Sequence, residues 1–327
     1  MKFYKIIFLI IFYILLSLVA ENIFGLKKYH NDIYNKKIKF LVDSNSDCNI
    51  LFLGSSTTLN AVIPEIFDKK FQTLEKSKIN LKTFNAAMQG ATLPESYLIL
   101  KNILSYKKNK IKYVFIGITP DAINPKLFSN NYFRNLAEPI DFIKFSRMFT
   151  PDTFKKEFLY YFTRGIETLA IYPFSSFFDI KENFKQFRGY EQPNVITVKN
   201  GLISDEHRSR LFELFDTMNN WTFANFDKNN TALNLIAELC SIHLINLILF
   251  DAPISQIAAD YITEKKNTFY KTRIMEFAEN NKINYIQLNI PYSADLNAFA
   301  DGLHLTRSTA IDFSNELAGH FADLVNR

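Results

Sequence analysis

Five short apolar runs along the chain predict the strands of a parallel sheet. Each run is continuous rather than alternating, which is typical of a strand covered on both of its faces. The runs lie at 49–53, 79–84, 112–118, 243–250 and 283–288. Helical patterns separate and follow them, at 64–71, 94–106, 232–239, 261–280 and 308–325. This alternation predicts a three-layer α/β fold, flavodoxin-like, whose five parallel strands have the order 2-1-3-4-5.

One long segment, from about residue 125 to about residue 235, interrupts this alternation. No buried parallel strand stands out in it, and it is too long for a simple loop. We therefore expect a mostly helical insert beside the carboxyl ends of the strands. Four aromatic residues of the insert are candidates for stacking on sugar rings, although aromatic residues at helical spacing more often form a core: Tyr160, Tyr161, Tyr190 and Trp221.

The N-terminus carries an uncharged apolar run at residues 6–20, which two lysines precede. With its aromatic neighbours the run approaches the roughly 17–20 residues that span a bilayer. We expect a transmembrane signal anchor at residues 1–22 and a polar stalk at residues 23–47. Because the positive charges precede the run, residues 48–327 are predicted to be exported, as a single-pass membrane protein whose domain lies in the periplasm or at the cell surface.

A cleaved signal peptide is the alternative for the same N-terminal residues. Ala20 stands at a possible cleavage point, but the position three residues before the cut is Leu18. A small residue is usual there, so the pattern favours the uncleaved anchor.

Composition and charge exclude several classes of function. The net charge of +5 is spread along the chain, whereas a nucleic-acid-binding protein would carry a clustered basic face. The sequence contains no zinc-type ligand spacing and no glycine-rich phosphate loop. It therefore predicts no metal, no cofactor and no nucleic-acid partner.

The two cysteines, Cys48 and Cys240, each precede a predicted strand. In the proposed order these strands are not neighbours, so they lie about 10 Å apart. A disulfide needs Cα atoms within about 7 Å of each other. The sequence therefore predicts two free, buried thiols.

A serine pair follows the first predicted strand directly, in Gly54-Ser55-Ser56, and opens a helix. A turn of this kind exposes a side chain at the carboxyl edge of the sheet and directs helix N–H groups toward negative charge that forms there. A serine in that position can attack a carbonyl while its own N–H stabilises the oxyanion. Taken alone, Gly-Ser-Ser is more often a plain turn with a helix cap.

A second motif, Asp301-Gly302-Leu303-His304, lies after the last predicted strand and before the last predicted helix. A spacing of three lets one short turn bring Asp301 and His304 to the same edge of the sheet. His304 can then accept a serine proton while Asp301 orients the ring and stabilises the imidazolium. An exposed aspartate with a capping histidine is the alternative.

Four other acidic or histidine residues weigh less as site candidates. Asp205 and His207 fit the start of a solvated helix inside the insert. His243 opens the fourth predicted strand and Asp251 ends it, so we expect a structural role for the first and a capping role for the second.

Together the two motifs resemble the SGNH/GDSL hydrolase superfamily, whose first block is Gly-Asp-Ser and whose last is Asp-x-x-His. Aligning Gly54 places the nucleophile at Ser56, with Ser55 in place of the usual aspartate. The resemblance implies the SGNH hydrolase fold and a catalytic triad of Ser56, Asp301 and His304.

The middle of the chain resembles the same superfamily less completely. The segment Asn85–Gly90 is similar to the second block, which implies that Gly90 and Ser56 donate N–H groups to the oxyanion. The third block usually supplies an asparagine, but the matching strand end here reads Gly117–Asp121 and has none. Either Thr119 substitutes for it or the oxyanion hole has two donors. The resemblance covers about 48–120 and 240–325.

The longer pattern Asn60–Pro64 with Phe67-Asp68 is similar to a membrane-anchored branch that includes the D-alanyl transfer protein of teichoic-acid operons and alginate O-acetylation proteins. That branch implies a serine esterase or O-acyltransferase acting on acyl esters of a cell-surface polysaccharide or envelope polymer. It also implies a membrane-bound O-acyltransferase as a partner. A catalytically silent envelope protein that binds a glycan or an acyltransferase is the alternative.

Overall fold

The computed structural model describes residues 37, 40–41, 47–74, 81–106, 110–120, 137, 139–146, 188, 190, 226–261, 264–288 and 295–326. The predicted anchor at residues 1–22, most of the predicted stalk and most of the predicted insert lie outside these residues. In the part that is described, no helix is long and apolar enough to cross a membrane.

Five parallel strands form a sheet in the order β2-β1-β3-β4-β5, which confirms the predicted order. The strands are β1 (Ile50–Leu53), β2 (Thr83–Asn85), β3 (Tyr113–Ile118), β4 (Asn246–Asp251) and β5 (Asn284–Ile286). Their residues are mostly buried, as expected for a parallel sheet with helices on both faces.

The helices of the described residues lie between these strands or after the last of them. They are α3 (Ser56–Ala61), α4 (Pro64–Leu74), α5 (Leu93–Tyr106), α7 (Pro139–Lys144), α11 (Phe226–Ile242), α12 (Gln256–Tyr261), α13 (Glu264–Asn280), the 3-10 turn η7 (Leu296–Ala298) and α14 (Arg307–Val325). The helix predicted at 261–280 is therefore preceded by a separate short helix, α12.

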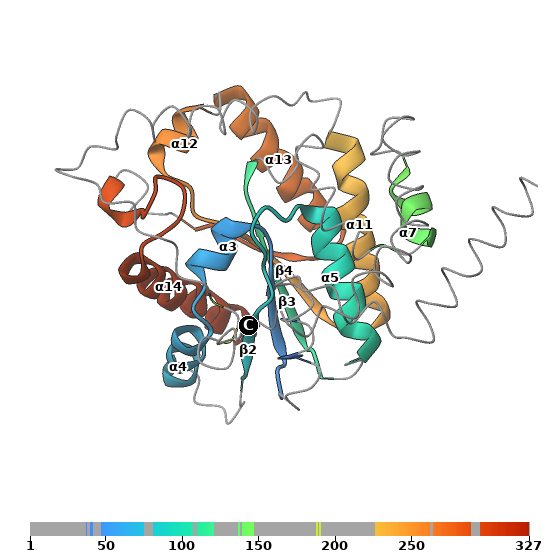
Figure 1. Cartoon of the computed structure of the whole chain (residues 1–327), viewed down its shortest axis with the longest axis horizontal. Helices are drawn as coiled ribbons and strands as arrows, with labels where there is room; N and C mark the ends of the chain where they lie inside the picture. Colours follow the sequence, from blue (N-terminus) through green and yellow to red (C-terminus); the bar gives the residue numbers. More distant parts are fainter. Residues whose placement is uncertain are drawn as a thin grey trace, which may run out of the picture.

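Successive residues of each strand point to opposite faces of the sheet, and this alternation produces three layers (Figure 1). On one face, Phe52, Phe115 and Phe250 pack against α4 and α14. The rings of Phe52 and Phe115 stack with centroids 4.7 Å apart, and Phe115 meets Phe321 of α14 edge-on at 5.1 Å. On the other face, α5, α11 and α13 cover the aliphatic side chains of the same strands.

The start of β4 differs from the prediction, which placed His243 in the strand. The strand begins at Asn246, because the preceding residues end α11 instead. Leu244 has φ +55°, its N–H donates to Ser241 O, and the next N–H donates to Cys240 O at 2.8 Å. This pattern is a Schellman cap, which satisfies carbonyls at the helix end with a left-handed residue.

The two cysteines are free and buried, which confirms that prediction. Cys48 Sγ donates to Ile50 O at 3.1 Å. Burial raises the pKa of the Cys240 thiol to about 12.

The structure describes four residues of the predicted stalk, and all four contact the domain; Asp47 does so through ion pairs with Lys82 and Lys110. Leu41 is buried in the core, and the Phe40 ring stacks on Phe84 with centroids 5.9 Å apart. The Lys37 ammonium is also buried and donates to Ala87 O at 3.1 Å. The end of this segment therefore packs beside β2.

Two of the described residues of the predicted insert, Arg188 and Tyr190, also contact the domain. The Arg188 side chain lies between two carboxylates of α4, with Nε 2.9 Å from Glu65 Oε1 and Nη1 2.5 Å from Asp68 Oδ2. The Arg188 carbonyl accepts the N–H of Asn85 at 2.9 Å. Tyr190 packs into the core on the α4 and α14 face, so its ring is not a surface platform for sugars.

Candidate active site

Ser56 is the first residue of α3 and lies one turn beyond the end of β1. The connection depends on Gly54, which has φ +144°, a conformation that L side chains rarely adopt. A Cβ at this position would lie 2.4 Å from Thr58 Oγ1 and 3.0 Å from Gly117 O. The glycine therefore allows a sharp turn from strand to helix, and the turn presents Ser56 at the carboxyl edge of the sheet.

Asp301 and His304 lie in a tight turn between η7 and α14. One carboxylate oxygen, Asp301 Oδ1, accepts the N–H groups of Leu303 at 3.0 Å and His304 at 2.8 Å. Gly302 between them has φ +81°, which suits its lack of a side chain. One oxygen of the Asp301 carboxylate thus stabilises the turn, and the second oxygen is left to bind the His304 ring.

The structure brings Ser56, His304 and Asp301 into one line of hydrogen bonds. His304 Nδ1 lies 2.6 Å from Asp301 Oδ2, and His304 Nε2 lies 2.7 Å from Ser56 Oγ. A carboxylate only accepts, so Nδ1 carries the proton and Nε2 is left to accept the Ser56 hydroxyl proton. This is the tautomer that a general base beside a serine nucleophile requires.

The three side chains are only partly shielded from solvent. Exposed fractions are 14% for the His304 side chain and 20% for the Asp301 side chain. Burial opposes ionisation of Asp301 most strongly, but hydrogen bonds from His304 and Leu303 and the charge of a protonated His304 ring outweigh it. The pKa of Asp301 therefore lies below its ordinary value, and the carboxylate stays ionised beside the ring.

The residues expected to bind the oxyanion follow three adjacent strands. Ser56 follows β1, Gly90 lies in the turn after β2, and Thr119 follows β3. Gly90 is exposed and has φ +69°. Thr119 is 1% exposed, and its hydroxyl has no hydrogen-bond partner within the described residues.

Asn85, at the end of β2, connects α3, the helix that begins with Ser56, to the loop that carries Gly90. Its Nδ2 is directed at two carbonyls of α3, those of Thr58 at 3.3 Å and Leu59 at 3.2 Å, and at that of the C-cap Val62 at 2.8 Å. Its Oδ1 accepts the Ala87 N–H at 3.1 Å. From the sequence, Asn85 served only to mark a family resemblance, and this connecting role was missed. The one local sign of the role is that a polar residue ends a buried strand.

Ser314 connects the end of α3 to α14, the helix that follows His304. It lies on α14, and its Oγ accepts the Ile63 N–H at 2.9 Å just beyond the end of α3. The same oxygen lies 3.2 Å from Ala61 O. Since α14 begins three residues after His304, this contact helps to fix the distance between the two functional side chains.

The two other acidic or histidine candidates that the structure describes, Asp251 and His243, do not join this group. Asp251 accepts a hydrogen bond from the Tyr285 hydroxyl on β5, and burial raises the pKa of the Asp251 carboxyl. His243 lies at the end of α11, near the amino edge of the sheet. Asp205 and His207 lie outside the described residues, as do Tyr160, Tyr161 and Trp221.

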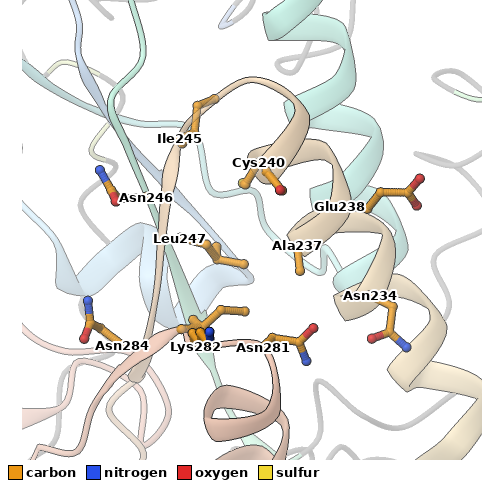
Figure 2. A pocket seen from close by; sticks show the side chains of 12 residues that line it. Asn234, Ala237, Glu238, Cys240, Ile245, Asn246, Leu247, Asn281, Lys282 and Asn284 are labelled. Carbon is orange, nitrogen blue, oxygen red and sulfur yellow. The ribbon is translucent and has the colours of Figure 1, made fainter.

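A cavity of about 480 Å³ lies at the opposite edge of the sheet (Figure 2). It opens between α11 and the end of α13 and is lined at the starts of β4 and β5 by residues such as Asn246 and Asn284. The triad lies beyond the carboxyl ends of the strands, so this cavity is separate from it. Among the described residues, no group of His, Cys, Asp or Glu could hold a metal ion.

The sequence matches no family model, and it matches no curated protein. Two similar solved structures are a lipase/acylhydrolase from Enterococcus faecalis and a GDSL-like lipase from Bacteroides thetaiotaomicron. The first has 11% identity and a TM-score of 0.41 and covers 84% of this chain and 96% of its own. The second has 12% identity and a TM-score of 0.41 and covers 90% and 98%. At these TM-scores the likenesses carry no weight for activity.

Proposed function

We propose that this chain is a serine esterase or O-acyltransferase with Ser56 as its nucleophile. The observation that carries the proposal is the 2.7 Å contact between Ser56 Oγ and His304 Nε2, with Asp301 Oδ2 2.6 Å from the other ring nitrogen. Two segments that are distant in sequence, the start of α3 and the turn before α14, supply the nucleophile, the base and the orienting carboxylate. That arrangement supports acyl transfer.

The first half of the reaction forms an acyl-enzyme. Ser56 Oγ attacks the carbonyl carbon of an ester while its proton passes to His304 Nε2. The negative charge that develops on the carbonyl oxygen is held by the N–H groups of Ser56 and Gly90. When the intermediate collapses, the C–O bond to the alcohol breaks and the alcohol takes the proton from His304.

The second half releases the acyl group and restores the enzyme. A water molecule or a sugar hydroxyl gives its proton to His304 and attacks the acyl carbonyl. The bond to Ser56 Oγ then breaks, and Ser56 recovers the proton from the imidazolium. Asp301 remains ionised throughout, because its role is to hold the ring and to stabilise the imidazolium.

For the substrate we propose acyl esters of a cell-surface polysaccharide or other envelope polymer. The support is the resemblance of the Gly54–Asp68 region to proteins that act on such polymers and the apolar run at residues 6–20. A membrane anchor at residues 1–22, an extracytoplasmic domain and a membrane-bound O-acyltransferase partner belong to the same proposal. The acylated polymer would reach the triad at the carboxyl edge of the sheet.

The test compares two adjacent serines in the full-length chain, with a chromogenic acetate ester as substrate. Ser56→Ala should abolish turnover because it removes the nucleophile. Ser55→Ala is the matched control, since Ser55 Oγ lies 2.8 Å from Thr57 Oγ1 rather than against His304. Full activity of Ser56→Ala would refute the assignment, and an inactive wild type would favour the silent binding protein.

A further inference from the structure

The turn between Phe299 and Leu305 carries Asp301 and His304 and is called the catalytic turn below. Ser255 contacts this turn through its side chain. It stands in the loop between β4 and α12 and is fully buried, with an exposed fraction of 0%. Its hydroxyl donates to the carbonyl of Gly302, a residue 47 positions later. Gly302 is the residue that separates Asp301 from the rest of the catalytic turn.

The base of this turn is held by its own main chain. Phe299 and Leu305 form an antiparallel bridge, the N–H of Ala300 donates to His304 O at 2.7 Å, and the N–H of Thr306 donates to Ala298 O at 2.9 Å. These bonds fix the two strands of the turn relative to each other. They do not fix its tip relative to the sheet.

At the tip, the N–H groups and the carbonyl have different partners. Asp301 accepts the N–H groups of Leu303 and His304, so the donors are satisfied inside the turn. The Gly302 carbonyl instead accepts from Ser255, which belongs to the loop after β4. This bond ties the tip to the sheet and therefore fixes where the Asp301 carboxylate stands.

We propose that Ser255 is a positioning residue for the acyl-transfer reaction, acting through Gly302 on the Asp301–His304 pair. The inference rests on the proposed function of Ser56, His304 and Asp301. Without the hydroxyl, the Gly302 peptide can turn and Asp301 Oδ2 loses its fixed place opposite His304 Nδ1. A displacement of this kind lowers the rate of the chemical step while binding of the ester is unaffected.

Ser255 also has a structural role as a helix cap, and the experiment has to distinguish this role from the proposed positioning of Asp301. Its Oγ accepts the Ala258 N–H at 3.3 Å, as expected for a residue that caps α12. One hydroxyl can donate to Gly302 and accept from Ala258 at once. A loss of stability alone therefore does not distinguish the two roles.

The test uses Ser255→Ala and Ser255→Thr in the full-length chain. Ser96→Ala is the matched control, because Ser96 on α5 is also buried and its hydroxyl donates to the carbonyl of Thr92, just before α5 and away from the turn. For Ser255→Ala we expect kcat for the chromogenic ester to fall about 10- to 100-fold with KM within about twofold. The acid limb of the pH–rate profile should also move to lower pH, and Ser255→Thr should restore most of the rate.

A second readout does not depend on turnover. The proton between His304 Nδ1 and Asp301 Oδ2 should give a downfield NMR signal that Ser255→Ala weakens or abolishes and Ser96→Ala leaves unchanged. In an Asp301→Asn background, Ser255→Ala should cost almost nothing further in kcat.

Equal kcat and equal pH profiles for Ser255→Ala and Ser96→Ala, with the downfield signal intact, would overturn the role of Ser255 and leave the proposed function standing. An inactive wild type would overturn the proposed function instead. In that case the NMR comparison still decides whether Ser255 holds the Asp301–His304 pair.

Discussion

Thr58 of α3 lies against Gly117 of β3, so closely that a Cβ added at Gly117 would come 2.0 Å from Thr58 Oγ1. The same Cβ would lie 2.8 Å from Phe250 Cζ. The missing side chain at Gly117 therefore allows α3 to sit directly on the sheet. Since Ser56 begins α3, the position of the nucleophile depends on this contact.

Gly117→Ala should move α3 and reduce both stability and activity. Overpacking of this kind costs about 1–3 kcal/mol, and the displaced Ser56 should lower kcat further. Gly319→Ala is the control, because its added Cβ would meet no atom within 4 Å beyond the chain neighbours and the backbone of its own helix, and the residue lies inside α14. That change should instead stabilise the protein by about 0.5–1 kcal/mol. Urea unfolding and ester turnover of both variants test this, and unchanged kcat for Gly117→Ala would contradict it.

The stability that Asp301 contributes should depend on pH in a defined direction. Its pKa in the folded protein is lowered, so the carboxylate stabilises the fold at any pH above the unfolded value of about 3.9. That contribution is lost as pH falls through the folded pKa. The free energy of unfolding of the wild type, minus that of Asp301→Asn, should be largest above about pH 5 and shrink below about pH 4. A difference that grows on acidification would contradict the lowered pKa.

Asn85→Asp should be strongly destabilising despite its small change in size. It replaces an amide that faces three carbonyl oxygens with a carboxylate, at a site with no exposure to solvent. We expect a loss of at least about 2 kcal/mol in unfolding free energy. Asn102→Asp is the matched control, since Asn102 is partly exposed and its Nδ2 bonds to Leu98 O at 3.0 Å within its own helix. A similar, small cost for both changes would show that Asn85 does not connect α3 to the Gly90 loop.

Both thiols should be unreactive in the folded protein. Cys48 is 3% exposed, and burial raises the pKa of Cys240 to about 12, so neither offers an accessible thiolate near pH 8. An aromatic disulfide reagent should detect two thiols per chain only after denaturation. Two thiols that react at once in the native protein would contradict the buried state, and none after denaturation would indicate a disulfide.

The main features of the fold follow from local patterns in the sequence. The apolar runs of β1, β3 and β4 are continuous because both faces of these strands are covered, and this continuity predicted a parallel sheet. The strand order was predicted from the flavodoxin-like fold class. Ser56 and the Asp301–His304 pair could be placed at one edge because each follows a strand or a turn in an alternating βα arrangement. The 2.7 Å distance that brings them together is a product of tertiary packing.

Other features depend on partners that are remote in sequence or carry no local signal. Asn85 acts on carbonyls 23 to 27 positions earlier, and Ser255 acts on one 47 positions later. Neither role can be recognised from spacing, since buried polar residues take their function from what surrounds them. The start of β4 was predicted wrongly because Leu244 adopts a left-handed conformation without being glycine.

The central claim is that His304 activates Ser56, and labelling of the full-length chain with a fluorophosphonate probe tests it most directly. Mass spectrometry of the digested wild type should find the adduct on Ser56, with none on Ser55. His304→Ala should slow labelling by about 10³-fold or more, because the base that removes the hydroxyl proton is gone. A wild type that takes up no probe, or a His304→Ala variant that reacts equally fast, would contradict the account.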